Sequence, residues 1–359
     1  MNTEFGNITE IELNICQKNV LGIDVGSTTA KIVLVQNGKI TYRKYERHYS
    51  QVRHKILEML LEMEPMIRNE RFYIAISGSA GLGLAHDAGL PFVQEVFATG
   101  ELVKQLQPDT SVVIELGGED AKIIFFKGFP EQRMNGTCAG GTGAFIDQMA
   151  TLLNVSIEEL DRLSLQSTKI YPIASRCGVF AKSDIQPLLN QGANKADIAA
   201  GIFQAVVDQT IAGLAQGRKI EGKVMFLGGP LYYCKGLRKR FVDTLKLDEN
   251  NAVFPEYGLF SVALGAALYA SKQQESLSFA ELAERMEKCT GKKQNTVCLR
   301  PLFENSESYE EFRKRHQKAA VESLDINGYS GDAYLGIDCG STTTKIVLIS
   351  KDRKLLYTY

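Results

Sequence analysis

The pattern of apolar and polar positions predicts alternating strands and helices over most of the chain. Continuous apolar runs that end in glycine or asparagine turns are typical of strands, whereas apolar residues spaced three and four apart indicate helices. Strands are expected at 20–35 and 38–45 (a hairpin around Asn37-Gly38), 71–77, 112–116, 121–127 and 224–227. Helices are expected at 51–68, 144–153, 194–215, 261–271, 278–288 and 309–321. The alternation predicts an α/β fold.

One strand–turn–strand segment occurs twice. Residues 21–35 read LGIDVGSTTAKIVLV and residues 335–349 read LGIDCGSTTTKIVLI, so 12 of 15 positions are identical. The first copy is followed by a full set of elements, and the second by only ten residues. We therefore expect six parts: an N-terminal tail at 1–19, a first lobe at 20–109, a second lobe at 110–255, a helix crossing back between the lobes at 256–275, a helical linker at 276–333, and the start of a truncated second repeat at 334–359.

Length and charge narrow the classes of protein. The chain of 359 residues is longer than one that a single hydrophobic core usually supports, which agrees with two lobes. The formal net charge of −1 argues against nucleic acid or an anionic membrane surface as the main partner. The polar N-terminus has no signal pattern, and no apolar run approaches the roughly 20 residues of a membrane span. A cytoplasmic protein is expected.

The seven cysteines do not form a CxxC motif, so neither a zinc ribbon nor a thioredoxin-type site is indicated. A disulfide framework is not expected in the cytoplasm. Cys234 and Cys339 are expected to have apolar packing roles. The four histidines have no ligand spacing and are expected at the surface.

Three glycine turns follow predicted strands. They are Asp24-Val-Gly-Ser-Thr-Thr29, Glu115-Leu-Gly-Gly-Glu-Asp120 and Gly228-Gly229. No GxxxxGK motif followed by Ser or Thr occurs, which excludes a P-loop. Two hairpin turns that each offer an acid and backbone N–H groups can clamp a triphosphate and Mg²⁺ from opposite sides. The third turn can bring backbone close to the nucleoside. One such turn is usually structural, but three in order, with the first duplicated, predict nucleotide binding.

With these turns, residues of about 20–272 resemble the superfamily of acetate and sugar kinases, heat-shock ATPases and actin. The turns match its first phosphate, second phosphate and adenosine motifs. The resemblance implies a two-lobed actin-like (ribonuclease H-like) ATPase fold with a nucleotide cleft between the lobes. ATP or ADP and Mg²⁺ are the implied ligands.

Two cysteines stand apart from the others. Cys138 precedes a predicted helix, where the helix dipole favours a thiolate, and Cys177 lies beside Gly178. Two small core cysteines are one interpretation. Half of a metal–sulfur cluster is the other, because such a cluster takes four thiolates and a symmetry-related subunit can supply the remaining two.

The sequence around Cys138 reads NGTCAGGTGAF at 135–145, and that around Cys177 reads SRCGVFAKSD at 175–184. These two segments resemble the cluster motifs of the 2-hydroxyacyl-CoA dehydratase activases. That family includes the ATP-hydrolysing subunits of benzoyl-CoA reductase. The resemblance implies a homodimer that shares one [4Fe-4S] cluster and couples ATP hydrolysis to delivery of a low-potential electron. It implies a dehydratase or reductase of an acyl-CoA as acceptor, and ferredoxin or flavodoxin as reductant. The tandem arrangement is similar to the large multidomain branch.

The chain departs from the small activases in two ways. Glu115 and Glu119 stand where the second phosphate motif usually has Asp and Gln. The duplication also means that a tandem domain could supply the other half of the cluster site in place of a second chain.

The leading hypothesis is an electron-transferring ATPase, with Asp24, Glu115 and Asp120 as candidate catalytic acids. Asp24 and Glu115 would hold hydrated Mg²⁺, and Lys31 and Asp120 would add charge near the phosphates. Cys138 and Cys177 would ligate the cluster. The phosphate-cradling residues would be Gly26, Ser27, Thr28, Thr29, Gly117 and Gly118, with Gly228 and Gly229 facing the adenosine.

Two alternatives stay open. A sugar or N-acetylhexosamine kinase would need a carboxylate base, for which Asp147 and Asp184 are formal candidates. A non-enzymatic module would only scaffold further domains.

Overall fold

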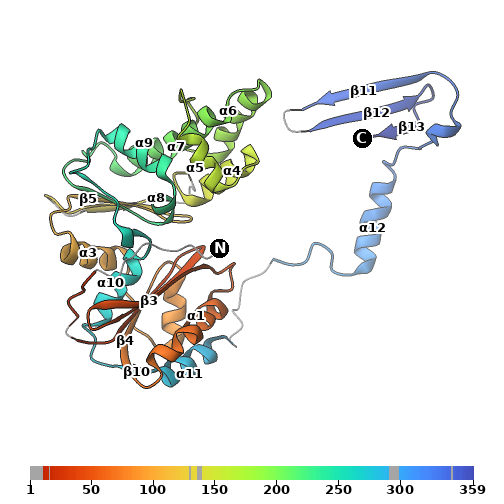
Figure 1. The fold of residues 1–359 in the computed structure, drawn as a ribbon. Helices are drawn as coiled ribbons and strands as arrows, with labels where there is room; N and C mark the ends of the chain where they lie inside the picture. Colours follow the sequence, from red (N-terminus) through yellow and green to blue (C-terminus); the bar gives the residue numbers. More distant parts are fainter. Residues whose placement is uncertain (1–10, 16, 129–130, 136–139, 291–298, 341–342) are drawn as a thin grey trace. The chain divides into compact units, whose positions relative to one another are not determined.

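The computed structural model describes residues 11–15, 17–128, 131–135, 140–290, 299–340 and 343–359. It divides into two compact units, Met1–Lys292 and Lys293–Tyr359. The first unit contains two lobes, which Figure 1 shows one above the other. Each lobe is built on a five-stranded sheet.

Lobe I has the sheet order β10-β4-β1-β2-β3. β1, β2 and β3 form an antiparallel meander, and β4 runs parallel to β1 on its other side. The turn between β2 and β3 has Asn37 and Gly38 at positive φ, the conformation that such tight hairpins need. The strands are β1 (Val20–Val25), β2 (Thr29–Gln36), β3 (Lys39–Arg47), β4 (Arg71–Ser77) and β10 (Leu277–Ser278).

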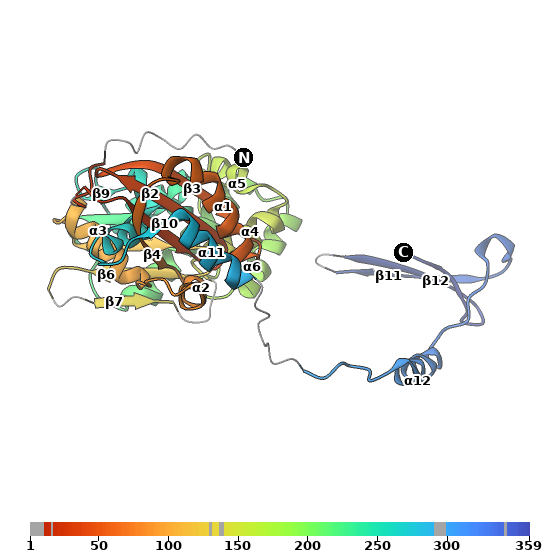
Figure 2. The same ribbon diagram turned by 90° about the horizontal axis from the view of Figure 1, so that it is seen from below.

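Helices cover both faces of the lobe I sheet. One face packs on α1, α2 and α11 in a core that includes Ile23, Ile32 and Leu34. Val20 and Val33 point to the other face, onto α10, where Ala98 and Leu102 of α3 join the same core. Figures 1 and 2 both show α1 and α11 side by side. The helices are α1 (Val52–Ile67), α2 (Gly81–Ala88), α3 (Glu95–Leu106), α10 (Ser261–Ala270) and α11 (Phe279–Thr290).

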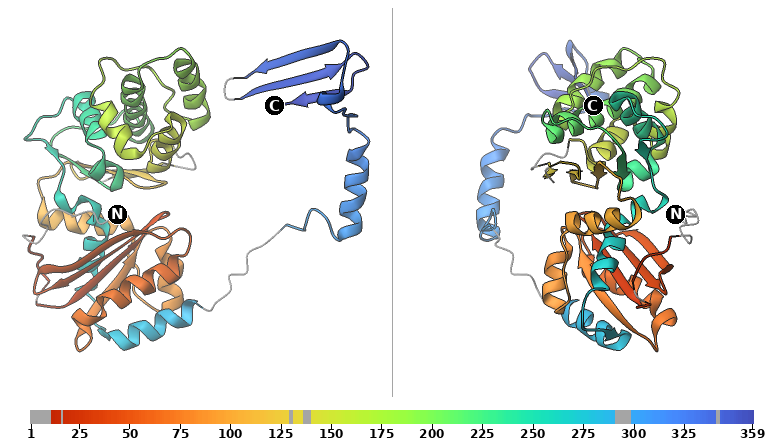
Figure 3. Two further views of the ribbon diagram at one scale, coloured as in Figure 1. Left: turned by 45° about the vertical axis from the view of Figure 1, so that its right-hand side comes forward. Right: turned by 90° about the vertical axis from the view of Figure 1, so that its left-hand side faces the viewer.

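Lobe II has the order β7-β6-β5-β8-β9 and repeats the antiparallel meander and the parallel fourth strand, since β8 is parallel to β5. Its fifth strand differs, because β9 is parallel to β8 whereas β10 is antiparallel to β4. One face of its sheet packs on a large helical layer, visible in Figure 3. The other face receives Val103 of α3, so this one helix contributes to both lobes. The strands are β5 (Val112–Leu116), β6 (Ala121–Phe125), β7 (Glu131–Met134), β8 (Val224–Leu227) and β9 (Ala252–Val253).

The helices expected at 144–153 and 194–215 are present in the helical layer of lobe II with small shifts at their ends, whereas the helices at 178–190, 229–233 and 235–245 were not predicted. The side chain of Ser156 accepts a hydrogen bond from the Glu159 N–H, and that of Asn194 one from Ala196, so both helices are capped. The elements are α4 (Gly143–Leu153), α5 (Ile157–Ser164), α6 (Gly178–Asn190), α7 (Lys195–Thr210), the π-helix η2 (Ile211–Ala215), α8 (Gly229–Tyr233), α9 (Lys235–Leu245) and the 3₁₀-helix η3 (Glu256–Leu259).

Residues Lys195–Ala215 form the one helix, within the described ranges, that is long and apolar enough to cross a membrane by length and composition. About two thirds of the residues in its most apolar stretch are buried inside the protein. Ile198, Ile202 and Val206 are fully buried in the core of lobe II, which accounts for the apolar composition.

Residues 277–290 were expected in the linker but pack on lobe I. β10 pairs with β4, and α11 buries Leu282, Met286 and Cys289 in the core beside α1. A capping box starts α11, with the Glu281 N–H donating to the Ser278 hydroxyl and the Ser278 N–H donating to the Glu281 carboxylate. Leu282, Met286 and Cys289 are four and three residues apart, which gives α11 an apolar face. The first unit therefore extends to Lys292.

The second unit contains the repeat of the first hairpin. β11 pairs antiparallel with β12, and Asp338 lies opposite Lys345 as Asp24 lies opposite Lys31. β11 is exposed along its whole length, whereas every residue of β1 is buried. Cys339 is therefore exposed, contrary to its expected packing role. The elements are α12 (Ser306–Gln317), the 3₁₀-helix η4 (Ile326–Gly328), β11 (Ala333–Cys339), β12 (Thr344–Ser350) and β13 (Leu355–Thr358).

Candidate nucleotide cleft and cysteine segment

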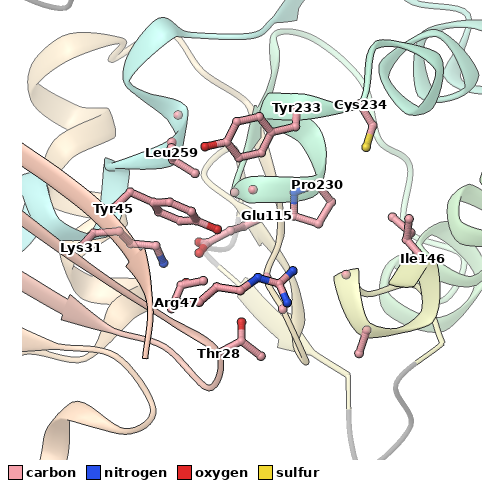
Figure 4. A pocket seen from close by; sticks show the side chains of 18 of the residues that line it. Thr28, Lys31, Tyr45, Arg47, Glu115, Ile146, Pro230, Tyr233, Cys234 and Leu259 are labelled. Atoms are coloured by element: carbon pink, nitrogen blue, oxygen red, sulfur yellow. The ribbon is translucent and has the colours of Figure 1, made fainter. Parts of the chain in front are cut away.

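The three glycine turns meet in one cleft between lobe I and lobe II, which encloses about 870 Å³ of free space, part of it open to solvent. Figure 4 shows its side chains converging from both lobes. The predicted site residues that line it are Asp24, Thr28, Thr29, Lys31, Glu115, Gly117, Gly118, Gly228 and Gly229. Gly26, Ser27 and Asp120 belong to the same turns but are not among its lining residues.

The first turn carries a buried ion pair. Asp24 is at the end of β1, and its Oδ2 lies 2.8 Å from the Nζ of Lys31 on β2. Burial lowers the pKa of Lys31, but Asp24 and the neighbouring acids outweigh that effect, so the net pKa is raised. The Gly26 N–H donates to the Thr29 carbonyl at 2.9 Å and closes the turn. Lys31 is therefore a fixed positive charge in the cleft.

His48 supports this turn from outside and corrects the expectation that the histidines lie at the surface. It is 3% exposed, and its Nε2 lies 2.9 Å from the Gly26 carbonyl. Its Nδ1 accepts a hydrogen bond from the Ser50 N–H at 3.2 Å, which leaves Nε2 to donate to Gly26. The spacing of the histidines pointed to no metal site, and no sequence motif indicated that His48 braces this turn.

The second turn holds a dense group of charges. Lys122 on β6 pairs with Glu95 of α3 and with Asp120 at 2.8 Å, and lies 3.8 Å from Glu115. Burial lowers the pKa of Lys122, but the three acids raise it by more, so the net pKa is raised. Burial raises the pKa of Glu115 to about 7, and Glu95 and Asp120 add to the rise against the opposing effect of Lys122. Asp120 is thus an ion-pair partner of Lys122 and lies beside the cleft.

The acids of the cleft suit a hydrated divalent cation. Glu115 is 7% exposed, and its Oε2 has no hydrogen-bond partner among the described residues. A buried carboxylate oxygen without a partner is costly, and a cation or its water shell satisfies it. Asp24 and Glu115 come from opposite lobes and line the same cleft. These residues fit Mg²⁺ held through water.

The third turn brings backbone against the second phosphate strand. Gly228 has a φ of +92°, and a Cβ there would lie 2.1 Å from the Leu116 carbonyl oxygen, so only glycine fits. Beside it Tyr233 of α8 and Tyr45 of β3 face each other across the cleft, with ring centroids 6.2 Å apart. Leu259 and Val262 add apolar surface. This end of the cleft offers aromatic and apolar faces suited to a nucleoside.

Sequence reasoning missed Tyr45, Arg47 and Tyr233. The expected hairpin partner ended at residue 45, whereas β3 continues to Arg47, which pairs with Thr29. Counting the ladder from the Asn37-Gly38 turn would have placed Arg47 beside the first phosphate turn. For Tyr233 the only signal was its position shortly after Gly229.

The second phosphate turn is bonded to α4. The Gly143 N–H donates to the Gly117 carbonyl at 2.9 Å, and the Ala144 N–H donates to the Gly118 carbonyl at 2.7 Å. On the other side, a Cβ on Gly118 would lie 2.3 Å from the Thr28 hydroxyl. The two phosphate turns are thus in contact across the cleft, and α4 follows the second one.

Residues 140–142 and 175–178, which flank the candidate cluster cysteines in the sequence, are called the cysteine segment, and residues 140–142 lead directly into α4. Cys138 lies outside the described residues. Cys177 is half-buried at the N-cap of α6. A Cβ on Gly140 would lie 3.0 Å from the carbonyl oxygens of Ser175 and Arg176, so the chain just after Cys138 touches the chain just before Cys177.

The described residues supply one of the two candidate cluster thiolates, that of Cys177. In the described ranges no group of three or more His, Cys, Asp or Glu side chains could hold a metal ion. A four-thiolate cluster therefore needs ligands beyond Cys177, and Cys138 is the nearest cysteine in the sequence.

The candidate bases of a kinase lie in different places. Asp147 of α4 lines the cleft, where its Oδ2 pairs with the Arg47 Nη2 at 3.5 Å. Asp184 of α6 accepts a hydrogen bond from the Ala174 N–H at 2.8 Å and is not among the residues that line the cleft.

The two described lobe II thiols should differ in reactivity. Cys234 lines the cleft but is 2% exposed, and burial raises the pKa of its thiol to about 12. Since the thiolate is the reactive form, we expect iodoacetamide at about pH 8 to modify Cys177 in chelator-stripped protein and to spare Cys234 until denaturant is added. Peptide mass spectrometry measures both sites. Equal rates at the two cysteines in folded protein would contradict this environment for Cys234.

Comparison with known proteins gives a consistent result. The sequence profile of the BadF/BadG/BcrA/BcrD ATPase family matches residues 21–270. The (R)-2-hydroxyglutaryl-CoA dehydratase activating ATPase of Acidaminococcus fermentans is 32% identical over 257 residues, which cover 70% of this chain and 97% of that protein.

Two solved structures are similar along nearly their whole length. Component A of the A. fermentans (R)-2-hydroxyglutaryl-CoA dehydratase has a TM-score of 0.64 at 30% identity and covers 71% of this chain and 98% of its own. The activator of the 2-hydroxyisocaproyl-CoA dehydratase from Clostridium difficile, with bound ADPNP, has a TM-score of 0.63 at 26% identity and covers 78% and 100%. The predicted two-lobed actin-like ATPase fold is confirmed.

Proposed function

Because the chain belongs to the BadF/BadG/BcrA/BcrD ATPase family, we propose that it is an ATP-hydrolysing activator that delivers a low-potential electron to a partner enzyme. The partner would be a dehydratase or reductase acting on an acyl-CoA. Related proteins are activators of 2-hydroxyglutaryl-CoA, lactoyl-CoA and 2-hydroxyisocaproyl-CoA dehydratases, which supports this class of acceptor. Ferredoxin or flavodoxin would be the reductant, in the cytoplasm.

One observation carries the proposal: the nucleotide cleft and the cysteine segment share α4. Its first two N–H groups bond the second phosphate turn. Two residues before Thr142, Gly140 packs on the backbone of Ser175 and Arg176. A change in the phosphate turn therefore reaches the cysteine segment through backbone contacts that no side-chain rotation can absorb.

The cleft residues would divide the work of hydrolysis. Asp24 and Glu115 would hold hydrated Mg²⁺ from the two lobes, where the metal would neutralise phosphate charge. Lys31 would place a fixed positive charge near the phosphates, and the Thr28 hydroxyl and the Gly118 N–H, from the two facing turns, would donate hydrogen bonds to them. Gly228 and Gly229 would face the adenosine.

Cys138 and Cys177 would hold half of a [4Fe-4S] cluster, which when bound supplies one-electron chemistry at low potential. The other half would come from a second chain or from a tandem domain. Val179 and Phe180, directly after Cys177 on α6, are 71% and 65% exposed. Adjacent exposed apolar side chains of this size favour a protein contact at that place.

The proposal is tested by iron and acid-labile sulfide after anaerobic purification of the wild type, Cys177→Ala and the matched control Cys234→Ala. About four irons per two chains, lost in Cys177→Ala and kept in Cys234→Ala, would support a shared cluster. ATP binding should survive both substitutions, since neither side chain carries a predicted phosphate contact.

A different result would point elsewhere. Iron-free wild-type protein from cells competent in cluster assembly, together with phosphorylation of sugars that Cys177→Ala retains, would overturn the proposal in favour of a sugar kinase. Failure to bind ATP would favour a scaffolding module.

A further inference from the structure

Arg47 is a charged side chain in the cleft that the predicted phosphate site leaves unused. It ends β3 opposite Thr29, and the next residue, His48, donates its N–H to the Thr28 carbonyl at 3.3 Å. Its root is thus fixed beside the first phosphate turn. Figure 4 shows its side chain extending between Thr28 and Glu115 toward Ile146 of α4.

Its partner lies on the opposite lobe. The Arg47 Nη2 is 3.5 Å from the Oδ2 of Asp147, one residue after Ile146 on α4. This ion pair links lobe I to the helix whose first N–H groups bond the second phosphate turn.

The pair is weak and easily exchanged. Its side chains are 51% and 42% exposed, and the distance is at the long end for an ion pair. Pairs of this kind contribute little to stability, because solvent screens them. A triphosphate in the cleft carries several negative charges and accepts the guanidinium fork in two places, so it outcompetes a single exposed carboxylate.

We propose that Arg47 binds the terminal phosphate of the nucleotide and that its release of Asp147 frees α4. Without nucleotide, Arg47 holds α4 against lobe I through Asp147. With triphosphate bound, Arg47 turns to the phosphate and α4 loses this tether. The proposal rests on the proposed function only in that the cleft binds ATP. Arg47 is then the residue that distinguishes ATP from ADP, and Asp147 is a positioning residue.

The first test compares the affinity of the full chain for ADP and for the β,γ-imido analogue of ATP by calorimetry. In Arg47→Gln we expect the preference for the triphosphate to fall about tenfold, as for loss of one charge-assisted hydrogen bond. In Asp147→Asn the preference should be kept or rise slightly, because the triphosphate no longer has to displace Asp147 from Arg47. Arg68→Gln, an exposed arginine paired with Glu64 on α1, is the matched control and should behave as wild type.

The second test follows hydrogen exchange in the peptide that covers α4. In the wild type the ATP analogue should speed exchange roughly two- to fivefold, the range for loss of an exposed ion pair. Asp147→Asn should exchange fast without nucleotide, and Arg47→Gln should be fast in both states. A charge-swapped double variant, Arg47→Asp with Asp147→Arg, should restore slow hydrogen exchange in α4 without nucleotide. It should not restore the preference for the triphosphate.

Two outcomes would overturn the inference: Arg47→Gln that keeps the wild-type triphosphate preference, or Asp147→Asn in which α4 still responds to nucleotide as in the wild type. These outcomes are separate from the iron measurement. Iron-free protein that shows the Arg47-dependent preference would refute the electron carrier and leave this inference standing, whereas intact iron with no such preference would do the reverse.

Discussion

Replacing Gly22 with valine is expected to destabilise lobe I by more than about 4 kcal/mol, enough to unfold it. Gly22 lies in the middle of β1, where the backbone of α10 approaches the strand. A Cβ at Gly22 would lie 1.9 Å from the carbonyl oxygen of Ala263 and 2.7 Å from the backbone N of Ala267. Both atoms are backbone and cannot rotate away, so the helix must move off the sheet and open the core.

The repeat supplies a matched control in the same chain. Gly336 is the equivalent residue of β11, and the nearest atom to a Cβ there is the carbonyl oxygen of Val347 at 3.9 Å. Gly336→Val should therefore leave urea unfolding of the first unit unchanged. Circular dichroism and tryptic digestion measure both variants. A Gly22→Val protein with wild-type unfolding would show that α10 does not press on β1.

The contrast between these glycines shows what sequence can and cannot predict. Residues 21–35 and 335–349 have nearly the same sequence and the same strand register, and both place an aspartate opposite a lysine. Local pattern therefore fixed the hairpins. Burial did not follow from it, because α10 and β4, which bury β1, are remote in sequence.

The candidate site divides in the same way. Asp24, Glu115 and the glycine pair were found because each belongs to a short local motif. Arg47 was missed because it enters the cleft through strand pairing and not through a motif. His48 was misjudged for a related reason, since its burial depends on the packing of the turn that it braces.

The charge group at the second turn was also beyond local reasoning. Lys122 is separated from Glu95 by 27 residues, and the two meet only when α3 packs beside β6. The same packing raises the pKa of Glu115 to about 7 through burial and neighbouring acids. A sequence shows which residues can ionise, but their proton affinity depends on the assembled lobes.

Replacing Asp24 with asparagine is expected to lower the rate of ATP hydrolysis at least about 100-fold. Asp24 is 3% exposed, and with Glu115 it forms the pair of acids that suits hydrated Mg²⁺. Asparagine keeps the shape but removes the charge that attracts the metal and balances Lys31. Steady-state phosphate release at saturating ATP and Mg²⁺ measures the loss, and ADP binding checks that the cleft is still formed.

The second aspartate of the repeat separates this role from a general effect of charge. Asp338 pairs with Lys345 at 3.0 Å, close to the 2.8 Å of Asp24 and Lys31, but its side chain is 67% exposed. The described residues of the second unit place no acidic turn opposite this exposed hairpin to enclose Mg²⁺ and phosphate, so Asp338→Asn in this chain should hydrolyse ATP at the wild-type rate. If Asp24→Asn kept its activity and Asp338→Asn lost it, ATP hydrolysis would have to be assigned to the second unit. The same substitution in the same local motif would then lower the rate of hydrolysis only in the exposed hairpin.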